Sequence, residues 1–344
     1  MTAFTEKLSA AAAEYLRRLR MENLTPKTLD NYERVISAFT AFCAETGQDD
    51  EFVAVVAWKT KLFENGASPA TIKQYLIDLQ IFFKAAAHRS YPQQIRFGEN
   101  PIDTTLMPKV PQRPYEIVLT DDQVMKLFAN CPPAPGYKNL WPRNWCIVML
   151  ALNEKIRNAE ILDLKLSDID MLHHVLVVES GKGRKYREVD LTPLTEFAIT
   201  QYLDSGIRPA YLSDDDYLFG TDASHTFGNN GEPKERWHRG TKQWVTEMIE
   251  RTVAAITGVH DVRSHDLRHV GSRICLNAGQ SMELLQGQLG HSQIATTQIY
   301  TSRMNSRRGR DSAKAVLAAR DEAAEKLFAQ YNNDQEQAVI PLFA

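Results

Sequence analysis

The sequence lacks the features of a membrane-spanning, secreted or disulfide-bonded protein. Its longest apolar run, at residues 145–152, falls well short of the roughly 20 residues that cross a bilayer. The first residues have neither the basic start nor the apolar stretch of a signal peptide. The 4 cysteines are scattered, with neither a Cys-x-x-Cys pair nor the spacing of metal ligands. We therefore expect a cytoplasmic protein with reduced thiols, no contact with a membrane and no bound metal.

An excess of positive charge is also missing. The chain has 40 lysine and arginine residues against 43 aspartate and glutamate residues, a net charge of −3, whereas proteins that bind nucleic acids are more often basic. Composition by itself therefore does not indicate DNA. Binding to DNA, however, depends on local neutralisation of phosphates. Local basic stretches occur at residues 17–20, 182–187 and 303–310, although each alone is more typical of a solvated face.

With 344 residues, the chain is too long for one hydrophobic core. Residues 5 to 105 are predicted to be helical throughout. Thr25 and Ser68 each place a capping hydroxyl before a proline at the first helical position, and apolar residues follow at helical spacing. These apolar stripes are expected to form the core of a helical domain at residues 1–107.

Proline marks the end of this domain. Four prolines between residues 100 and 114 disfavour helix, so residues 108–116 are predicted to be a linker. Helix resumes at Thr120, where Thr-Asp-Asp-Gln is a capping box. The second domain, residues 117–305, is predicted to mix helices with one pair of strands.

The strands are predicted at residues 175–179 and 186–191, joined by a Gly-Lys-Gly-Arg-Lys turn. In the second strand Arg187, Val189 and Leu191 alternate with more polar neighbours, which is the pattern of a half-buried strand.

A tail, residues 306–344, forms the last part. It ends in the apolar run Ala-Val-Ile-Pro-Leu-Phe-Ala. Since apolar side chains are unfavourable in water, we expect the tail to dock on another surface. Before that run, residues at helical spacing form an apolar stripe: Val316, Ala319, Ala323, Leu327 and Tyr331.

Four residues near the end of the second domain carry a chemical pattern. His265 and Arg268 lie three apart in Ser-His-Asp-Leu-Arg-His and so share one helix face. His291 follows in Leu-Gly-His-Ser, and Tyr300 lies nine residues further on. That spacing would place them on opposite faces of one helix, so His291 is expected on the turn before the helix of Tyr300. Without the other residues of this pattern, Tyr300 would be interpreted as a residue of the hydrophobic core.

Arg157 and Lys182 complete the set. A guanidinium offers two donors that match two phosphate oxygens. Glu160 shares a helix face with Arg157, so a structural ion pair is the alternative role. Lys182 lies at the tip of the turn between the strands, and its alternative role is that of a solvated lysine without a part in the chemistry. Cationic and proton-donating groups together with one phenol suit an attack on a phosphodiester without a metal.

In this order and spacing, the six residues resemble the tyrosine recombinase (phage integrase) family. The resemblance covers residues 5 to about 305, and the helices that start at Thr25 and Ser68 resemble the family's core-binding domain. It implies a mainly α fold with a small antiparallel β-sheet. A helical core-binding (SAM-like) domain and a mixed α/β catalytic domain would form a C-shaped clamp on DNA.

The resemblance also implies the role of each residue. Tyr300 attacks the scissile phosphate and forms a 3′-phosphotyrosyl bond, while Arg157 and Arg268 clamp that phosphate. His265 and His291 donate hydrogen bonds and handle the tyrosine proton. Lys182 protonates the leaving 5′ oxygen. The covalent intermediate keeps the energy of the broken bond, so neither a cofactor nor a metal is needed. The implied DNA-binding residues are Lys27, Lys73, Lys109, Arg113, Arg184, Lys185 and Arg187.

The implied partners are double-stranded DNA sites and further copies of the chain. Family members exchange strands through a Holliday junction as a homotetramer on two paired sites, in some cases with accessory DNA-bending proteins. This implies a protein associated with the nucleoid. In related recombinases a C-terminal segment packs on the neighbouring protomer, so residues 306–344 are expected to dock in trans. Folding back on their own domain is the alternative.

Two positions depart from the family pattern. Glu154-Lys155-Ile156 replaces the usual Thr-Gly-Leu and is expected to alter the turn that presents Arg157, and Val270 replaces a common threonine. The helical domain begins almost at Met1, which leaves no room for an arm-binding domain. This favours a simple recombinase for integration, excision or resolution of a mobile element. The alternatives are chromosome dimer resolution, strand relaxation like that of a type IB topoisomerase, and a non-catalytic DNA-binding regulator.

Overall fold

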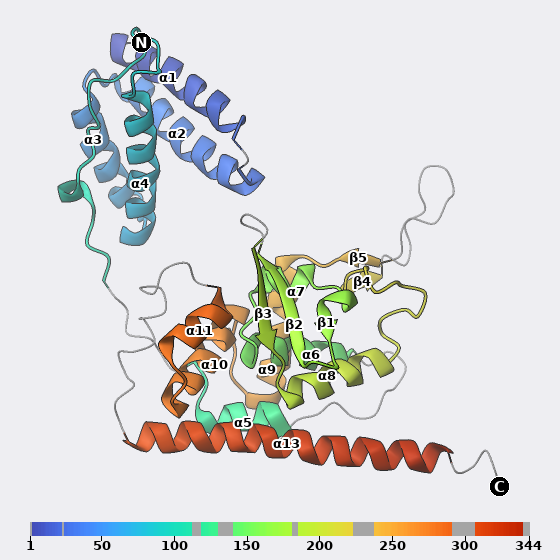
Figure 1. Cartoon of the computed structure of the whole chain (residues 1–344). Coiled ribbons are helices and arrows are strands. Elements are labelled where there is room, and N and C mark those ends of the chain that lie inside the picture. The colour runs from blue at the N-terminus through green and yellow to red at the C-terminus, as the bar shows by residue number, and fades with distance from the viewer. Residues whose placement is uncertain are drawn as a thin grey trace. The chain divides into compact units, whose positions relative to one another are not determined.

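The computed structural model describes residues 2–22, 24–111, 118–129, 140–180, 185–222, 237–290 and 307–339. The chain divides into two compact units, residues 1–115 and 116–344. Helices predominate in both, as the sequence predicted, and the described strands form two small antiparallel sheets, of which the sequence predicted one (Figure 1). No helix of the described ranges is long and apolar enough to cross a membrane.

The described part of unit 1 contains four helices, and the sequence predicted where two of them start. The Thr25 hydroxyl accepts a hydrogen bond from the backbone N–H of Thr28, and Ser68 does the same for Thr71. Both helices therefore begin at the proline that follows the cap. The helices are α1 (Ala3–Leu19), α2 (Pro26–Thr46), α3 (Glu51–Glu64) and α4 (Pro69–Ala86).

The helical prediction for residues 87–105 was wrong. After α4 the chain consists of turns, bends and irregular backbone, with one 3-10 turn, η1 (Thr104–Leu106). Tyr91, Phe97 and Ile102 nevertheless lie in the core of the unit, each about as buried as the helical core residues. Proline and glycine disfavour helix here, and the segment is fixed by inserting side chains between helices instead.

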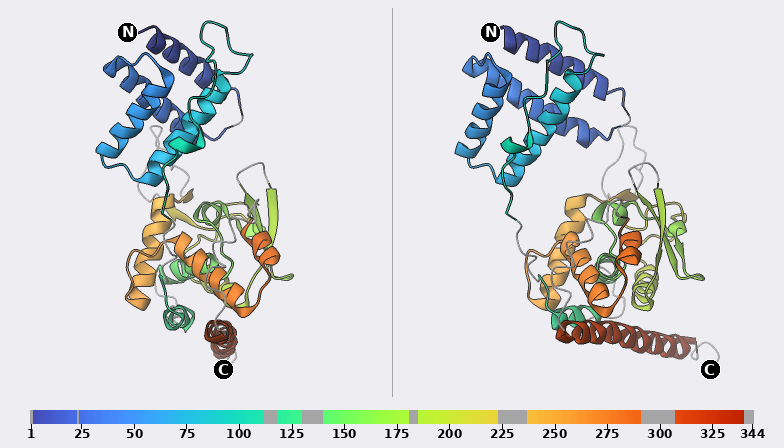
Figure 2. Two further views of the ribbon diagram at one scale, coloured as in Figure 1. Left: turned by 90° about the vertical axis from the view of Figure 1, so that its left-hand side faces the viewer. Right: turned by 60° about the vertical axis from the view of Figure 1, so that its left-hand side comes forward.

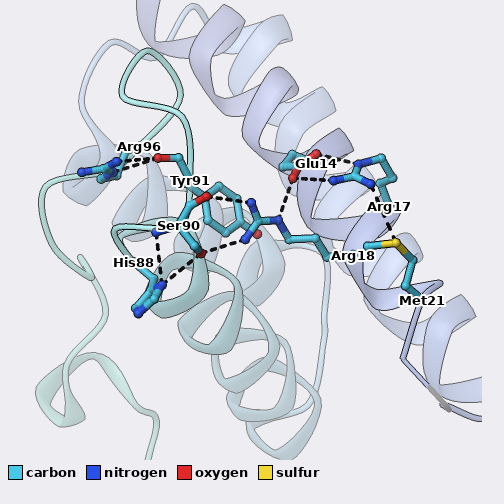
Figure 3. A network of polar contacts seen from close by, with 8 residues as sticks. All are labelled: Glu14, Arg17, Arg18, Met21, His88, Ser90, Tyr91 and Arg96. Atoms are coloured by element: carbon cyan, nitrogen blue, oxygen red, sulfur yellow. Dashed lines mark hydrogen bonds and ion pairs between the residues drawn. The ribbon is translucent and has the colours of Figure 1, made fainter.

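The basic stretch at residues 17–20 is used partly within the unit (Figure 3). Arg17 and Arg18 both pair with Glu14, at 2.8 and 2.6 Å. Arg18 also donates to the side chain and the carbonyl of Ser90 and lies over the ring of Tyr91. These contacts tie α1 to the segment after α4, so Arg18 has a structural role.

Unit 2 packs around α6 (Trp141–Leu152), which is buried along most of its length and contacts α8, α9 and α10 (Figures 1 and 2). The nitrogen of the Trp145 indole donates to the Leu127 carbonyl at 2.9 Å, so this large side chain is buried with its polar atom satisfied. The other helices are α5 (Asp121–Ala129), α7 (Asn158–Asp163), η2 (Leu166–Asp168), α8 (Pro193–Asp204), α9 (Lys242–Thr257), α10 (Ser264–Ala278), α11 (Met282–Leu289) and α13 (Arg307–Val339).

The strand prediction is confirmed to within a residue. The main sheet has the order β1-β2-β3, with β1 at Ile169–Asp170, β2 at Val175–Ser180 and β3 at Lys185–Asp190. Leu176 faces Val189 across the antiparallel pair. A second sheet pairs β4 (Gly220–Asp222) with β5 (Trp237–Arg239).

The tail helix α13 lies along its own unit, against α5, α8 and α10 (Figures 1 and 2). Val316 is fully buried there, and the Phe328 and Phe197 rings meet edge to face at 5.0 Å. The hydroxyl of Tyr331 donates to Asp204 at 2.5 Å. Within this chain α8 and α10 cover the stripe, which is the arrangement named as the alternative, while docking of the tail on a neighbouring protomer stays a prediction. Residues 340–344 lie outside the described residues.

We expect Phe328→Ala to lower the free energy of unfolding of unit 2 by about 1–3 kcal/mol, because a half-buried ring loses its contact with Phe197. Thermal unfolding at two protein concentrations measures the effect. The loss should be the same at both, since the contact lies within one chain. Lys326→Ala, on the exposed side of the helix, should change stability little. A loss that appears only at high concentration would point to docking between chains.

Candidate functional site

The turn between α6 and α7 presents Arg157. Lys155 adopts the left-handed conformation at φ 58°, which costs a residue with a side chain about 1 kcal/mol relative to glycine. Its ammonium group donates to the Asn153 carbonyl at 2.6 Å, and the buried Glu154 carboxylate accepts from the N–H and hydroxyl of Thr192. The departure from the family pattern is therefore accommodated by contacts to this turn, which ends with Arg157 at the N-cap of α7.

Helix α10 lies directly against this turn. A Cβ on Gly271 would come within 1.9 Å of the Leu152 carbonyl oxygen, so only glycine fits at this crossing. Arg268, one turn earlier on α10, is 3% exposed and donates to the Lys155 carbonyl. The predicted Arg268 is thus fixed to the turn that presents the predicted Arg157.

Three arginines from separate elements bind the last carbonyls of α11. Arg187 of β3 donates to Gln288 at 2.9 Å, Arg268 to Leu289 at 2.6 Å, and Arg157 to Gly290 at 3.3 Å. These carbonyls lack partners within the helix because it ends at Gly290, whose φ is 60°. Positive charge at the C-terminal end of a helix is favourable. The next residue along the chain is the predicted His291.

Glu160 of α7 links two of these arginines. One oxygen accepts from Arg157 at 2.8 Å and from Arg187 at 2.9 Å; the other accepts from Arg187 at 2.7 Å and from the backbone N–H of Arg157 at 2.9 Å. Burial alone would raise the pKa of Glu160, but the hydrogen bonds and charge of Arg187, followed by those of Arg157, lower it to about 2. The carboxylate is therefore ionised at neutral pH.

His265 lies on the exposed side of α10, with its ring 4.1 Å from that of His269. Burial lowers the pKa of His265 below its usual 6.5, while the neighbouring Asp266 acts in the opposite direction. The positive charges of Arg268 and Arg157 add to the lowering. The imidazole is therefore mainly neutral at pH 7, beside two guanidinium groups.

Of the six residues predicted to be catalytic, Arg157, His265 and Arg268 are brought together. Lys182, His291 and Tyr300 lie outside the described residues. The predicted pairing of Arg157 with Glu160 is also present, and the role of Arg157 in binding phosphate stays a prediction. Its side chain remains 38% exposed in spite of that pair.

The residues predicted to bind DNA have different surroundings. Lys27, Lys73 and Lys109 are exposed, and Lys185 is the first residue of β3. Arg113 and Arg184 lie outside the described residues. That Arg187 binds DNA stays a prediction. Its side chain is 11% exposed and is held by Glu160 and the carbonyl of Gln288.

Sequence reasoning missed Glu160 and Arg187 as a pair. The alternation of β3 had placed Arg187 on the buried face with Val189 and Leu191, which was a usable signal. A buried arginine requires an anionic partner, but no local pattern connects it to Glu160. Within the described ranges, no group of three or more His, Cys, Asp or Glu side chains is placed to hold a metal ion.

Comparison with known proteins identifies the class of this fold and site. The model of the phage integrase family matches residues 118–307. The chain is 28% identical over 299 residues to the tyrosine recombinase XerC of Oceanobacillus iheyensis, covering 83% of this chain and 89% of the relative. It is 26% identical to XerA of Thermococcus onnurineus, covering 86% and 92%.

Solved structures share the fold. A XerH site-specific recombinase bound to a palindromic difH substrate superposes with a TM-score of 0.62 at 20% identity, covering 83% of this chain and 79% of that one. The Tn1549 transposon integrase in complex with transposon end DNA gives 0.59 at 19% identity, covering 90% and 97%. The chain therefore belongs to the phage integrase family. Its members are tyrosine recombinases, enzymes that cleave and rejoin DNA.

Proposed function

We propose that this protein is a site-specific DNA recombinase that uses Tyr300 as its nucleophile and serves a mobile element. The observation that carries the proposal is the convergence of Arg157, His265 and Arg268. Two of these guanidinium groups bind adjacent carbonyls immediately before residue 291, and both act on the pKa of His265. This arrangement concentrates positive charge at the start of the segment that carries His291 and Tyr300.

In the proposed reaction, the phenolic oxygen of Tyr300 attacks the scissile phosphorus. A Tyr–O–P bond forms, and the bond from phosphorus to the 5′ oxygen breaks. The phenolic proton passes to His265 or His291, and the 5′ oxygen takes a proton from Lys182. Arg157 and Arg268 stabilise the charge that builds on the non-bridging oxygens. The 5′ hydroxyl of a second strand then reverses these steps, so that no external energy source is needed.

The proposed substrate is double-stranded DNA, bound at paired sites by a homotetramer, with DNA-bending proteins as accessory partners. The exposed Lys27, Lys73 and Lys109 are proposed to contact phosphates, for which a lysine charge is sufficient. The overall charge of −3 makes such local contacts necessary. The names of the relatives support recombination. The mobile-element role rests on the long α13, which continues past the family match.

Capture of the covalent intermediate tests this function. The protein is expressed in cells that carry its gene in the native context, and adducts are trapped by denaturation in SDS. Sequencing the attached and the rejoined DNA identifies the site. Joined ends of a mobile element support the proposal, whereas two copies of one chromosomal site would indicate dimer resolution instead. In vitro, adduct formation should persist in EDTA; complete loss on chelation would contradict the metal-free reaction.

We expect Lys182→Ala to slow cleavage, since the 5′ oxygen then leaves without a proton. A substrate with sulfur at that 5′ position should restore the rate, because a thiolate leaves without protonation. The measurement is adduct formation in a single turnover on both substrates. Lys326→Ala is the control and should match the wild type on each. If Lys182→Ala slowed adduct formation equally on both substrates, Lys182 would not be the proton donor and would be a solvated lysine of the turn.

The lowered pKa of His265 predicts how cleavage depends on pH. If the neutral imidazole accepts the tyrosine proton, the acid limb of the cleavage rate should lie below pH 6.5, the usual histidine value. The rate on the captured site is measured between pH 5 and 8. His265→Gln should be slower and should lose this limb. An acid limb above pH 6.5 that persists in His265→Gln would assign the proton to another group.

A further inference from the structure

Arg187 has a position that the proposed chemistry does not use. It lies on β3 and points inward, where its guanidinium forms two parallel hydrogen bonds with Glu160 and a third with the carbonyl of Gln288. A Cβ on Gly290 would lie only 3.2 Å from its Nη1 atom, so it also lies against the end of α11. Arg187 therefore touches both the carboxylate partner of Arg157 and the helix end that Arg157 binds.

The Glu160 carboxylate has four hydrogen-bond donors, two from Arg187 and two from Arg157. Only one of the two from Arg157 comes from its guanidinium; the other comes from its backbone. A carboxylate has about four lone-pair sites, so it is saturated. The ion pair with Arg187 is also the more buried one, with 11% exposure of the arginine against 38% for Arg157. Arg187 thus occupies half of the acceptor capacity of Glu160.

Without Arg187, the negative charge of Glu160 would lose the more buried of its two arginine partners. Glu160 would stay buried, with an exposed side-chain fraction of 7%, and an unpaired buried carboxylate is strongly unfavourable. Among the described residues, Arg157 would be the only remaining arginine that pairs with it. A bidentate Arg–carboxylate pair would then compete directly with a phosphate, because both use the same planar donors.

We propose that Arg187 is a positioning residue that satisfies Glu160 and thereby leaves the guanidinium of Arg157 available to the scissile phosphate. The inference rests on the proposed role of Arg157 in phosphate binding. This role differs from a purely structural one. A structural role would act through the hydrogen bond from Arg187 to the Gln288 carbonyl, whereas the proposed role acts through the negative charge of Glu160. Removing that charge should therefore make Arg187 dispensable.

Four proteins test this: wild type, Arg187→Gln, Glu160→Gln and the double variant. A glutamine at position 160 can still cap the N–H of Arg157. At saturating DNA, Arg187→Gln should slow adduct formation by on the order of 10- to 100-fold, as expected for a displaced phosphate ligand. The double variant should recover to the rate of Glu160→Gln. A double variant as slow as Arg187→Gln, or an Arg187→Gln as fast as wild type, would overturn the proposal.

A control and a second readout keep the result interpretable. Arg239→Gln breaks a neighbouring pair with Asp163 at the end of α7 and should leave the rate unchanged. Inorganic phosphate is also titrated against the four full-length proteins, and arginine side-chain signals are followed by NMR. Phosphate should bind more weakly to Arg187→Gln and regain the Glu160→Gln affinity in the double variant. If the wild type forms no adduct, the proposed function fails, while unchanged phosphate binding in Arg187→Gln would refute the role of Arg187.

Discussion

Replacing Tyr300 with phenylalanine is expected to abolish the covalent adduct with DNA while leaving DNA affinity unchanged. The substitution removes one oxygen atom and retains the ring, so packing around residue 300 should be largely preserved. Without a nucleophile, cleavage should fall by on the order of 10⁴-fold or more. Affinity should persist because it depends on phosphate contacts made by other residues.

The measurement uses a suicide substrate made from the captured site, with a nick beside the scissile phosphate. The short cleaved fragment diffuses away, so the adduct accumulates and is counted on a denaturing gel. Tyr211→Phe is a matched control, since Tyr211 is 62% exposed in the same unit. An adduct that persists in Tyr300→Phe would show that another residue is the nucleophile.

The second large effect is expected from Arg268→Ala, which should reduce cleavage by about 10²-fold or more, as for loss of a preorganised donor to a developing oxyanion. Arg268 is more buried than Arg157, and it holds the carbonyls of Lys155 and Leu289. Each carbonyl left without this donor would cost about 1–3 kcal/mol. Arg268→Ala should therefore also lower the stability of unit 2.

Arg157→Ala separates the two effects. This side chain is more exposed and binds one carbonyl weakly, at 3.3 Å, so stability should change less while cleavage still falls by about 10²-fold. Cleavage rates and thermal unfolding are compared for both variants and for Arg268→Lys, which keeps the charge but not the planar pair of donors. A cleavage rate for Arg268→Lys equal to wild type would show that charge alone is sufficient at this position.

Local patterns predicted much of the fold correctly. The Thr25 and Ser68 caps, the Thr120 capping box and the strands β2 and β3 are all present, because each depends on residues a few positions apart. Residues 87–105 were misassigned because apolar side chains in an irregular segment of turns can fill a core as well as those of a helix. The alternation in β3 correctly placed Arg187 on the buried face, but it did not indicate that Glu160 is its partner.

The tail illustrates a different limit. Its apolar stripe correctly indicated a helix that must be covered. Periodicity identifies the face to be buried but carries no information on which surface covers it. The partner surface comes from α5, α8 and α10, which lie far from the tail in the sequence.

The sequence alone determined the family, the helix starts at Thr25, Ser68 and Thr120, and the placement of His265 and Arg268 three residues apart on one helix, since these follow from short-range patterns. The tertiary structure decided which cations share a site. Arg157, Arg187 and Arg268 meet at consecutive carbonyls of α11, although they lie 133, 101 and 21 residues from their acceptors. It also decided that Arg187 binds Glu160, because partners for a buried charge are set by packing between distant segments.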